Sequence, residues 1–248
     1  MEASSSPVGI RTSTLSLEGI RKRYGETVAL AGLDLTIRSG ELLGIAGPNG
    51  AGKSTLIRIL AGEEPADAGA IRLDGALWSP SERFRQAAVV HQEPQLFPNL
   101  TVKENLLVSR ERYLIGRPKA SAAELNVLSE LGIREAADIQ VDMCSLVVRQ
   151  LTEIAKALVW EADVFLFDEP NSALTEEESA LLFEHVHALA ARGRFVILVS
   201  HRVGELVAHA HRVAIIREGR CAAVLEGDTL SEEAIARQLV VGESRHEN

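Results

Sequence analysis

The sequence predicts an α/β fold in which a mainly parallel β-sheet is sandwiched between helices. Short apolar segments alternate with segments of helical periodicity along the chain, an order that favours parallel strands joined by helices. One apolar segment leads directly into a glycine-rich loop and then into a helix. A helix-rich region opens at Thr101 and runs, with breaks, to about Trp160, and it would form a subdomain inserted into the sheet.

The strands and the helix of the first part of the chain are predicted from local patterns. Apolar and polar residues alternate over residues 33–37, as expected of a half-buried strand. Residues 41–46 form a short apolar run before the glycines, and residues 54–61 after them have the character of a helix. Further short strands are expected at residues 71–74 and 87–90.

Three capping patterns predict where helices begin. Residues 79–82 combine a serine N-cap, a proline at the first helical position and a glutamate at the third, and residues 101–104 form a capping box. The third pattern begins at Thr175, with Glu178 in the capping-box position. The helix that it opens carries four apolar residues on one side, Leu182, Phe183, Val186 and Leu189.

The remaining strands flank and follow that helix. Residues 164–167 and 195–199 are apolar runs that predict buried strands. Residues 214–217 and 222–225 predict a closing hairpin, with Glu218-Gly219 as its turn. Together these elements predict the mainly parallel, sandwiched sheet.

Composition excludes several classes of protein. The 248 residues include 26 basic and 35 acidic side chains, a net charge of −9, which argues against a general nucleic-acid binder. Cys144 and Cys221 lack the spacing of metal ligands and are expected to be reduced thiols. No apolar run approaches the roughly 20 residues of a membrane-spanning helix, and residues 1–14 lack a signal peptide's apolar centre. Any role in transport would therefore need a separate membrane partner.

The glycine-rich loop is the most specific motif of the chain. It matches G-x-x-x-x-G-K-[ST] and consists of Gly47, Pro48, Asn49, Gly50, Ala51, Gly52, Lys53, Ser54 and Thr55. Its glycines let successive backbone N–H groups and the start of the helix point at phosphate oxygens. Lys53 would add a positive charge between the outer phosphates, and the Ser54 hydroxyl would be a ligand of Mg²⁺.

Two carboxylates follow the apolar strand at residues 164–167. Asp168 would hold Mg²⁺ through water, and Glu169 is placed to polarise an attacking water molecule. Such a strand end is often only a strand that reaches solvent. Its combination with the phosphate loop earlier in the chain is far more specific.

From about residue 15 to residue 242 the chain resembles ATP-binding-cassette proteins, in particular the sugar-importer ATPases of the ribose, galactose and xylose type. The stretches that carry this resemblance are His91-Gln92-Glu93, residues 100–105 (LTVKEN), residues 153–158 (EIAKAL), Asp168-Glu169-Pro170, Ala173-Leu174-Thr175 and Ser200-His201-Arg202. The resemblance implies a P-loop NTPase fold with an antiparallel β subdomain and a helical subdomain at about residues 98–160. Residues 1–14 would be a disordered tail, residues 15–242 one nucleotide-binding domain, and residues 243–248 a second tail.

The resemblance also implies roles for single residues. Tyr24 would stack on adenine, Gln92 would touch Mg²⁺ and the attacking water, and His201 would hydrogen-bond the γ-phosphate. Without the resemblance, each of these residues has an ordinary structural explanation, as packing or as a satisfied polar group. The expected ligands of the site are ATP and Mg²⁺.

One motif of the family is altered. Its signature, L-S-G-G-Q or L-S-x-G-Q, aligns with residues 144–150, where Ser145 is kept and Val147 replaces a glycine. In this family the signature contacts the nucleotide held by the other cassette of a head-to-tail dimer, so Ser145 is expected to bind a partner's nucleotide. Asn171 and Thr175 are smaller departures from the family pattern.

The resemblance implies an ATP-hydrolysing subunit of an importer for a sugar or a similar polar solute. Its partners would be a transmembrane permease, an external solute-binding protein indirectly, and a second cassette. That cassette would be a copy of this chain or one with an intact signature. The subunit would work at the cytoplasmic face of the membrane, with residues 93–109 receiving the permease.

Three matters stay open at this point. Most of the sugar-importer relatives carry two fused cassettes, so this chain would be either a freestanding subunit or a portion of a longer protein. A non-transport cassette that acts on nucleic acid or ribosomes is one alternative function. A regulatory subunit that binds ATP with low turnover is another, favoured by Val147 and opposed by Glu169.

Overall fold

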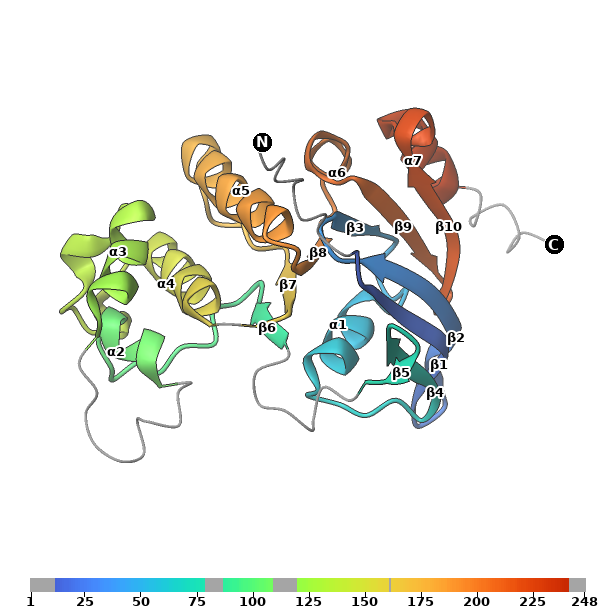
Figure 1. The fold of residues 1–248 in the computed structure, drawn as a ribbon, viewed down its shortest axis with the longest axis horizontal. Coiled ribbons are helices and arrows are strands. Elements are labelled where there is room, and N and C mark those ends of the chain that lie inside the picture. Colours follow the sequence, from blue (N-terminus) through green and yellow to red (C-terminus); the bar gives the residue numbers. More distant parts are fainter. Residues whose placement is uncertain (1–11, 79–86, 109–119, 161, 241–248) are drawn as a thin grey trace, which may run out of the picture.

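The computed structural model of the chain describes residues 12–78, 87–108, 120–160 and 162–240. These residues form two β-sheets and the helices that cover them (Figure 1). One sheet has six strands in the order β10-β9-β3-β8-β7-β6, and the other has four strands in the order β2-β1-β4-β5. The predicted helix start at residues 79–82 lies outside the described residues.

The six-stranded sheet confirms the predicted parallel core. Its strands β6, β7, β8, β3 and β9 pair in parallel, and β10 pairs with β9 in an antiparallel hairpin. Every residue of β3 and β8 is buried, as expected of strands covered on both faces. The strands are β3 (Leu42–Ala46), β6 (Ala87–Val90), β7 (Val164–Asp168), β8 (Phe195–Val199), β9 (Arg212–Arg217) and β10 (Arg220–Glu226).

The four-stranded sheet is antiparallel and contains two strands that the sequence patterns did not predict, its first and its last along the chain. Its strands are β1 (Thr14–Tyr24), β2 (Thr27–Arg38), β4 (Ala68–Leu73) and β5 (Ala76–Leu77). In β1, Leu15, Leu17 and Ile20 are buried, so the period of two breaks between Leu17 and Ile20. The register shifts at the same place, next to Gly19 with its positive φ of 59°. This bulge removed the alternation by which a strand is recognised.

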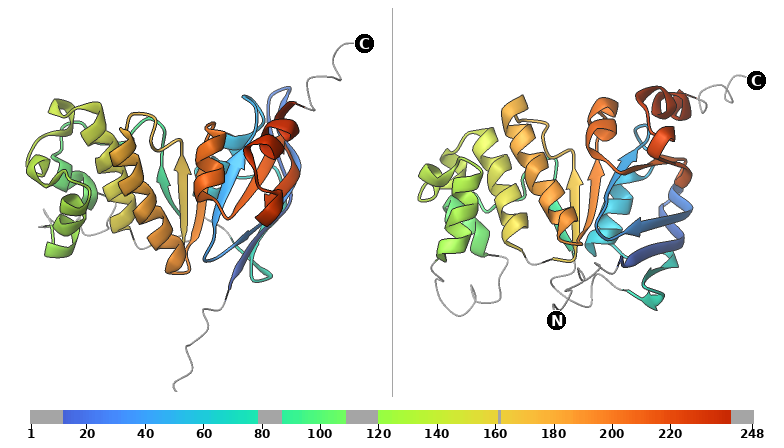
Figure 2. Two further views of the ribbon diagram at one scale, coloured as in Figure 1. Left: turned by 90° about the horizontal axis from the view of Figure 1, so that it is seen from above. Right: turned by 45° about the horizontal axis from the view of Figure 1, so that its top comes forward.

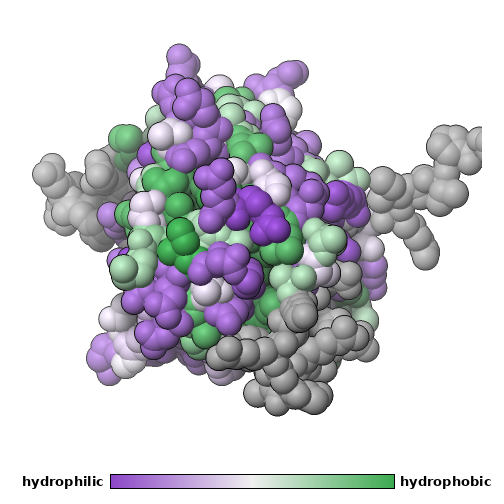
Figure 3. Space-filling view, turned by 90° about the vertical axis from the view of Figure 1, so that its left-hand side faces the viewer, coloured by the Kyte–Doolittle hydropathy of each residue, from purple (hydrophilic) through white to green (hydrophobic). Residues whose placement is uncertain are grey.

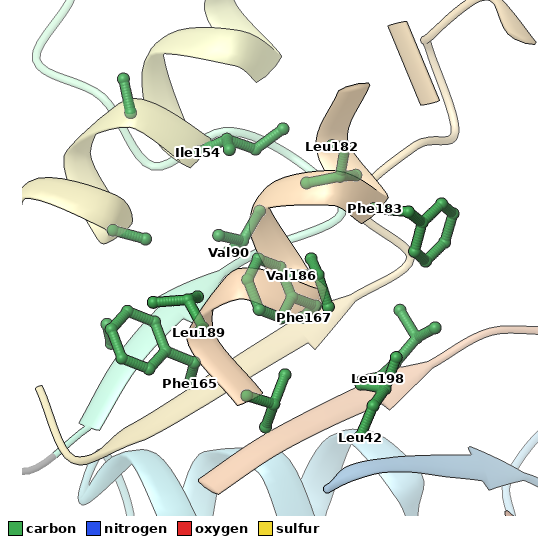
Figure 4. Close-up of a cluster of buried hydrophobic side chains, with 14 of the residues drawn as sticks. Leu42, Val90, Ile154, Phe165, Phe167, Leu182, Phe183, Val186, Leu189 and Leu198 are labelled. Carbon is green, nitrogen blue, oxygen red and sulfur yellow. The ribbon is translucent and has the colours of Figure 1, made fainter. Parts of the chain in front are cut away.

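Helices cover both faces of the six-stranded sheet. Helix α1 (Lys53–Ala61) packs between the two sheets in one apolar cluster, and a second cluster on the opposite face joins the sheet to the other helices (Figure 1). The other helices are α2 (Val102–Leu107), α3 (Ala122–Glu130), α4 (Leu146–Val159), α5 (Glu176–Ala191), α6 (Val203–His209) and α7 (Glu232–Val240). Figure 4 shows the second cluster, in which the apolar side of α5 lies against Phe165, Phe167 and Leu198 of the strands.

The helix-rich region between β6 and β7 stands beside the sheet rather than on it (Figure 2). It contains α2, α3, α4 and the short 3₁₀ turns Arg134–Ala136 and Val141–Met143. The predicted capping boxes at Thr101 and Thr175 are confirmed, and Ser121 begins α3 in the same way. The outer end of this region presents interspersed polar and apolar side chains (Figure 3). Among the described residues, no helix has the length and apolar character needed to cross a membrane.

The predicted hairpin turn connects three parts of the structure. Glu218 and Gly219 have φ of 49° and 69°, the left-handed conformation that such a two-residue turn requires. The Ala31 N–H donates to the Gly219 carbonyl at 2.9 Å, and the Gly219 N–H donates to the Ala51 carbonyl at 3.0 Å. The turn therefore ties β2 to the glycine-rich loop that precedes α1.

Gly219→Ala tests this connection. A Cβ at this position would lie 2.7 Å from both the Ala29 carbonyl oxygen and the Ala31 nitrogen, which are backbone atoms that cannot rotate away. We expect a loss of about 1–3 kcal/mol from overpacking in addition to the strain of a positive φ. Gly132→Ala is the matched control, because Gly132 has a φ of 70° and no atom within 4 Å of the new Cβ. Equal losses in chemical denaturation would contradict the proposed close packing.

Candidate functional site

The glycine-rich loop lies between β3 and α1, where two glycines are required by close packing. A Cβ on Gly47 would lie 2.2 Å from the Ile216 carbonyl oxygen, and one on Gly52 would lie 2.5 Å from the Ala29 carbonyl oxygen. Gly52 also has a φ of 104° and is the N-cap of α1 without any side-chain capping bond. The N–H groups at the start of α1 therefore have no capping side chain, the arrangement in which helix starts bind phosphate.

Lys53 is the first residue of α1 and its ammonium group is held by the loop itself. Its Nζ donates to the Gly47 carbonyl at 2.7 Å and to the Pro48 carbonyl at 2.9 Å. Burial lowers the pKa of Lys53, and the nearby carboxylates of Glu169 and Asp168 oppose this shift. The phosphate loop and the acidic strand end are thus close enough to interact electrostatically.

A cavity of about 570 Å³ lies beside the loop and brings together the three predicted magnesium ligands. It is lined by Ser54, Ile57, Arg58, Glu63, His91, Gln92, Glu93, Gln95 and Asp168. Burial raises the pKa of Asp168, Glu169 raises it further, and His91 and Lys53 oppose this. A hydroxyl, an amide and a carboxylate are the oxygen ligands that Mg²⁺ takes in proteins when substrate phosphates complete its shell. The residues present therefore fit this ion.

Glu169 contacts the other two predicted catalytic residues, Gln92 and His201. Its carboxylate accepts a hydrogen bond from Gln92 Nε2 at 3.2 Å, and its Oε2 lies 2.9 Å from His201 Nδ1. The three side chains follow β6, β7 and β8, neighbouring parallel strands whose carboxyl ends meet at one edge of the sheet. Glu169 itself has a φ of 49°, and its N–H donates to the Val199 carbonyl at 3.0 Å. This left-handed backbone turns the side chain toward the site.

The predicted adenine contact, Tyr24, ends β1 and is 41% exposed. Its hydroxyl bonds to Glu64, and Lys22 and Arg58 lie over its ring at 5.7 and 5.9 Å from the centroid. Arg58 also lines the cavity and was missed from the sequence. Its spacing of four residues from Ser54 places both on one side of α1, so helical periodicity alone could have indicated it.

Ser145 lies in a different part of the molecule from the other predicted residues. It is the exposed N-cap of α4, and its Oγ accepts a hydrogen bond from the Val148 N–H at 3.3 Å. None of residues 144–150, all of which the structure describes, lines the cavity beside the phosphate loop. Val147 is half-buried and packs against the second apolar cluster.

The fold and the site define a class of protein. A six-stranded core sheet, an antiparallel sheet, a phosphate loop between β3 and α1, and helices inserted between β6 and β7 are the parts of an ATP-binding cassette. Solved cassettes have the same fold. An ATP-binding cassette of an ABC transporter in its ADP conformation is 26% identical, with a TM-score of 0.76 over 90% of this chain and 95% of its own. A nucleotide-free cassette from an ABC transporter is 25% identical, with a TM-score of 0.77 and the same coverage.

Sequence comparisons identify the family. The ABC transporter family model matches residues 30–172, and the chain belongs to this family. The ribose import ATP-binding protein RbsA 2 of Streptomyces avermitilis is 38% identical over 91% of this chain and 46% of its own length. The arabinose import ATP-binding protein AraG 2 of Burkholderia thailandensis is also 38% identical, over 85% of this chain and 41% of its own length. The chain thus spans less than half the length of these relatives.

The raised pKa of Asp168 generates a test of the site in the absence of nucleotide. At pH above that pKa, the folded state holds a carboxylate that burial and Glu169 disfavour, and this cost disappears as the pH falls and the group is protonated. We therefore expect Asp168→Asn to raise the melting temperature at pH 8, by about 2–4 °C for each kcal/mol relieved. The difference from wild type should shrink toward pH 4.

The control for this measurement is Asp163→Asn. Asp163 precedes the same strand and its carboxylate, 62% exposed, pairs with Arg194 at 2.7 Å. Because this pair is exposed, the substitution should change the melting temperature little. A wild-type chain that is more stable than Asp168→Asn at pH 8 would contradict the assigned electrostatics.

Proposed function

We propose that the chain is the ATP-binding and ATP-hydrolysing subunit of an ABC importer, powering uptake of a sugar or a similar small polar solute. The observation that carries this proposal is the contact of Gln92 and His201 with the Glu169 carboxylate, beside the phosphate loop. Two relatives are named as ribose and arabinose import ATP-binding proteins, and these names support the importer assignment.

Different groups of the chain would bind different parts of the nucleotide. Phosphate oxygens would accept hydrogen bonds from the N–H groups at the start of α1. Lys53 now donates to the Gly47 and Pro48 carbonyls, and it would donate to the outer phosphates instead. Ser54, Asp168 and Gln92 would hold Mg²⁺, which supplies positive charge against the phosphates. Tyr24, which is 41% exposed, would offer a flat surface to adenine.

Glu169 would act as the general base for the attacking water. Its carboxylate lies at the carboxyl end of β7, where contacts with Gln92 and His201 fix its orientation. It is therefore oriented before the attacking water binds. Gln92 would orient the water, and His201 would turn from Glu169 to the γ-phosphate as nucleotide binds. The left-handed backbone of Glu169 is a local strain of the kind found at active sites.

A second cavity supports a membrane partner. It has a volume of about 580 Å³ and is lined by Gln92, Glu93, Pro94, Leu96, Pro98, Val141, Asp142, Leu146, Arg149, Gln150, Ser172 and Ala173. Gln92 lines both cavities. A change in its position on nucleotide binding would therefore also be felt by a permease helix bound in the second cavity. Residues 93–98 fall within the segment predicted for this contact. The subunit would then act at the cytoplasmic face of the membrane, with an external solute-binding protein as an indirect partner.

A second cassette would complete the site. Ser145 and the start of α4 are exposed and separate from this chain's own phosphate loop, which suits a contact with nucleotide held by another cassette. That cassette would be a copy of this chain or one with an intact signature. A low-turnover regulatory role is the alternative that Val147 favours. The net charge of −9 argues against action on nucleic acid or ribosomes.

Glu169→Gln tests the proposed activity. ATP binding should persist, because the loop and Lys53 hold the phosphates, whereas hydrolysis should fall by about 10²-fold or more without the base. The measurement is steady-state phosphate release with Mg-ATP, with binding followed separately by calorimetry. Turnover near that of wild type would show that Glu169 is not the base, and a wild-type chain without turnover in the assembled transporter would refute the ATPase proposal.

Val147→Gly tests the altered signature. A β-branched side chain at the start of α4 should hold the partner's phosphate away from the helix N–H groups, and one lost donor can cost about 10²–10³ in rate. The substitution should therefore raise turnover of a homodimer while leaving the nucleotide affinity of the isolated chain unchanged. Adding Ser145→Ala should cancel the gain. Equal rates for wild type and both variants would contradict a limiting signature.

A further inference from the structure

A buried carboxylate joins the two loops that carry Glu169 and His201. Glu205 lies in the first turn of α6, and its side chain is 8% exposed. One of its oxygens accepts a hydrogen bond from Asn171 Nδ2, and the other accepts one from Ser200 Oγ at 2.7 Å. Asn171 and Ser200 are each 3% exposed. The carboxylate is therefore bound from two sides by neutral donors that are themselves buried, and the exposed Arg202 guanidinium lies 3.9 Å from the oxygen that Asn171 bonds.

These two donors are close in sequence to the catalytic pair. Asn171 follows Glu169 by two residues, and Ser200 directly precedes His201. Ser200 Oγ also accepts the Arg202 N–H at 3.1 Å, which orients its hydroxyl toward Glu205. Because Glu169 Oε2 lies only 2.9 Å from His201 Nδ1, a small shift of either loop would break that contact.

Helix α6 is itself fixed at its far end. The His209 ring stacks on Phe183 of α5 with 3.7 Å between centroids and an angle of 5°. His209 Nδ1 also shares a hydrogen bond with His187 Nε2 at 3.3 Å, and Leu206 is fully buried. Glu205 therefore belongs to a helix that is packed against α5 and the core. Its carboxylate can hold both loops in place because the helix itself is fixed.

We infer that Glu205 is a positioning residue for ATP hydrolysis, which with Asn171 and Ser200 holds Glu169 and His201 in their working geometry. The inference rests on the proposed ATPase function. It gives a role to Asn171, which departs from the threonine expected in the family. The side chain of Asn171 supplies the amide that reaches Glu205 from the Glu169 loop.

The test exchanges donors and acceptors within the network. Glu205→Gln replaces an acceptor with an amide donor, so either Asn171 or Ser200 loses its acceptor. Asn171→Asp places two carboxylates face to face. The double variant Glu205→Gln/Asn171→Asp restores complementarity, because the new amide donates to the new carboxylate and its oxygen still accepts from Ser200.

We expect each single variant to lower kcat for Mg-ATP by roughly tenfold with little change in KM, the effect of one unmatched buried hydrogen-bonding group. The double variant should recover most of kcat. The matched control is Glu41→Gln. Glu41 is 8% exposed and accepts from Arg212 at 2.7 Å, away from the catalytic loops, so its loss should lower the melting temperature but not the kcat of the folded chain.

A second readout does not depend on turnover. With ¹⁵N-labelled histidine and no nucleotide, the His201 ring signals, assigned through His201→Gln, should move in both single variants. They should return in the double variant and stay unchanged in Glu41→Gln. Unmoved His201 signals in Glu205→Gln would overturn the inference even if the chain proves to have no ATPase activity. A kcat that only follows the folded fraction, as in Glu41→Gln, would also overturn it.

Discussion

The parallel pairing of β6, β7, β8 and β3 is the constraint on which the rest of the structure depends. Val90 pairs with Phe167, and Asp168 and Ile45 both pair with Val199, so the four strands end together at one edge. The phosphate loop, Gln92, Glu169 and His201 all follow these strand ends. The register of these buried apolar strands therefore brings the phosphate loop, Gln92, Glu169 and His201 to the same edge of the sheet.

This placement brings opposite charges together in a partly buried site. Burial lowers the pKa of Lys53 and raises the pKa of Asp168, so it disfavours the charged form of both groups, and the attraction between the two opposes each shift. In the chain alone, Lys53 is satisfied by loop carbonyls, and Glu169 by Gln92 and His201. Phosphates with Mg²⁺ would replace these internal partners, which explains how a site can be ordered before its ligand binds and still change on binding.

Most of the fold could be predicted because its patterns are local. Continuous apolar runs identified β3, β7 and β8, and the capping boxes identified the starts of α2 and α5. Strand β1 could not be recognised because its bulge breaks the alternation, and α6 has too few residues to show a helical period. The phosphate loop and the acidic strand end each consist of consecutive residues, so a motif could predict them, and the structure places Ser54 and Asp168 in one cavity. The contacts among Asn171, Ser200 and Glu205 join three separate segments, and no sequence pattern specifies them.

The central claim is that this edge of the sheet binds the phosphates of ATP through Lys53. The most direct measurement is the melting temperature of the wild-type chain and of Lys53→Ala across a titration with Mg-ATP, with Lys103→Ala in the helical region as the control. Wild type and the control should gain stability that grows by about 1.4 kcal/mol for each tenfold rise in ligand above Kd, whereas Lys53→Ala should gain little at the same concentrations. An equal gain by Lys53→Ala would contradict the account.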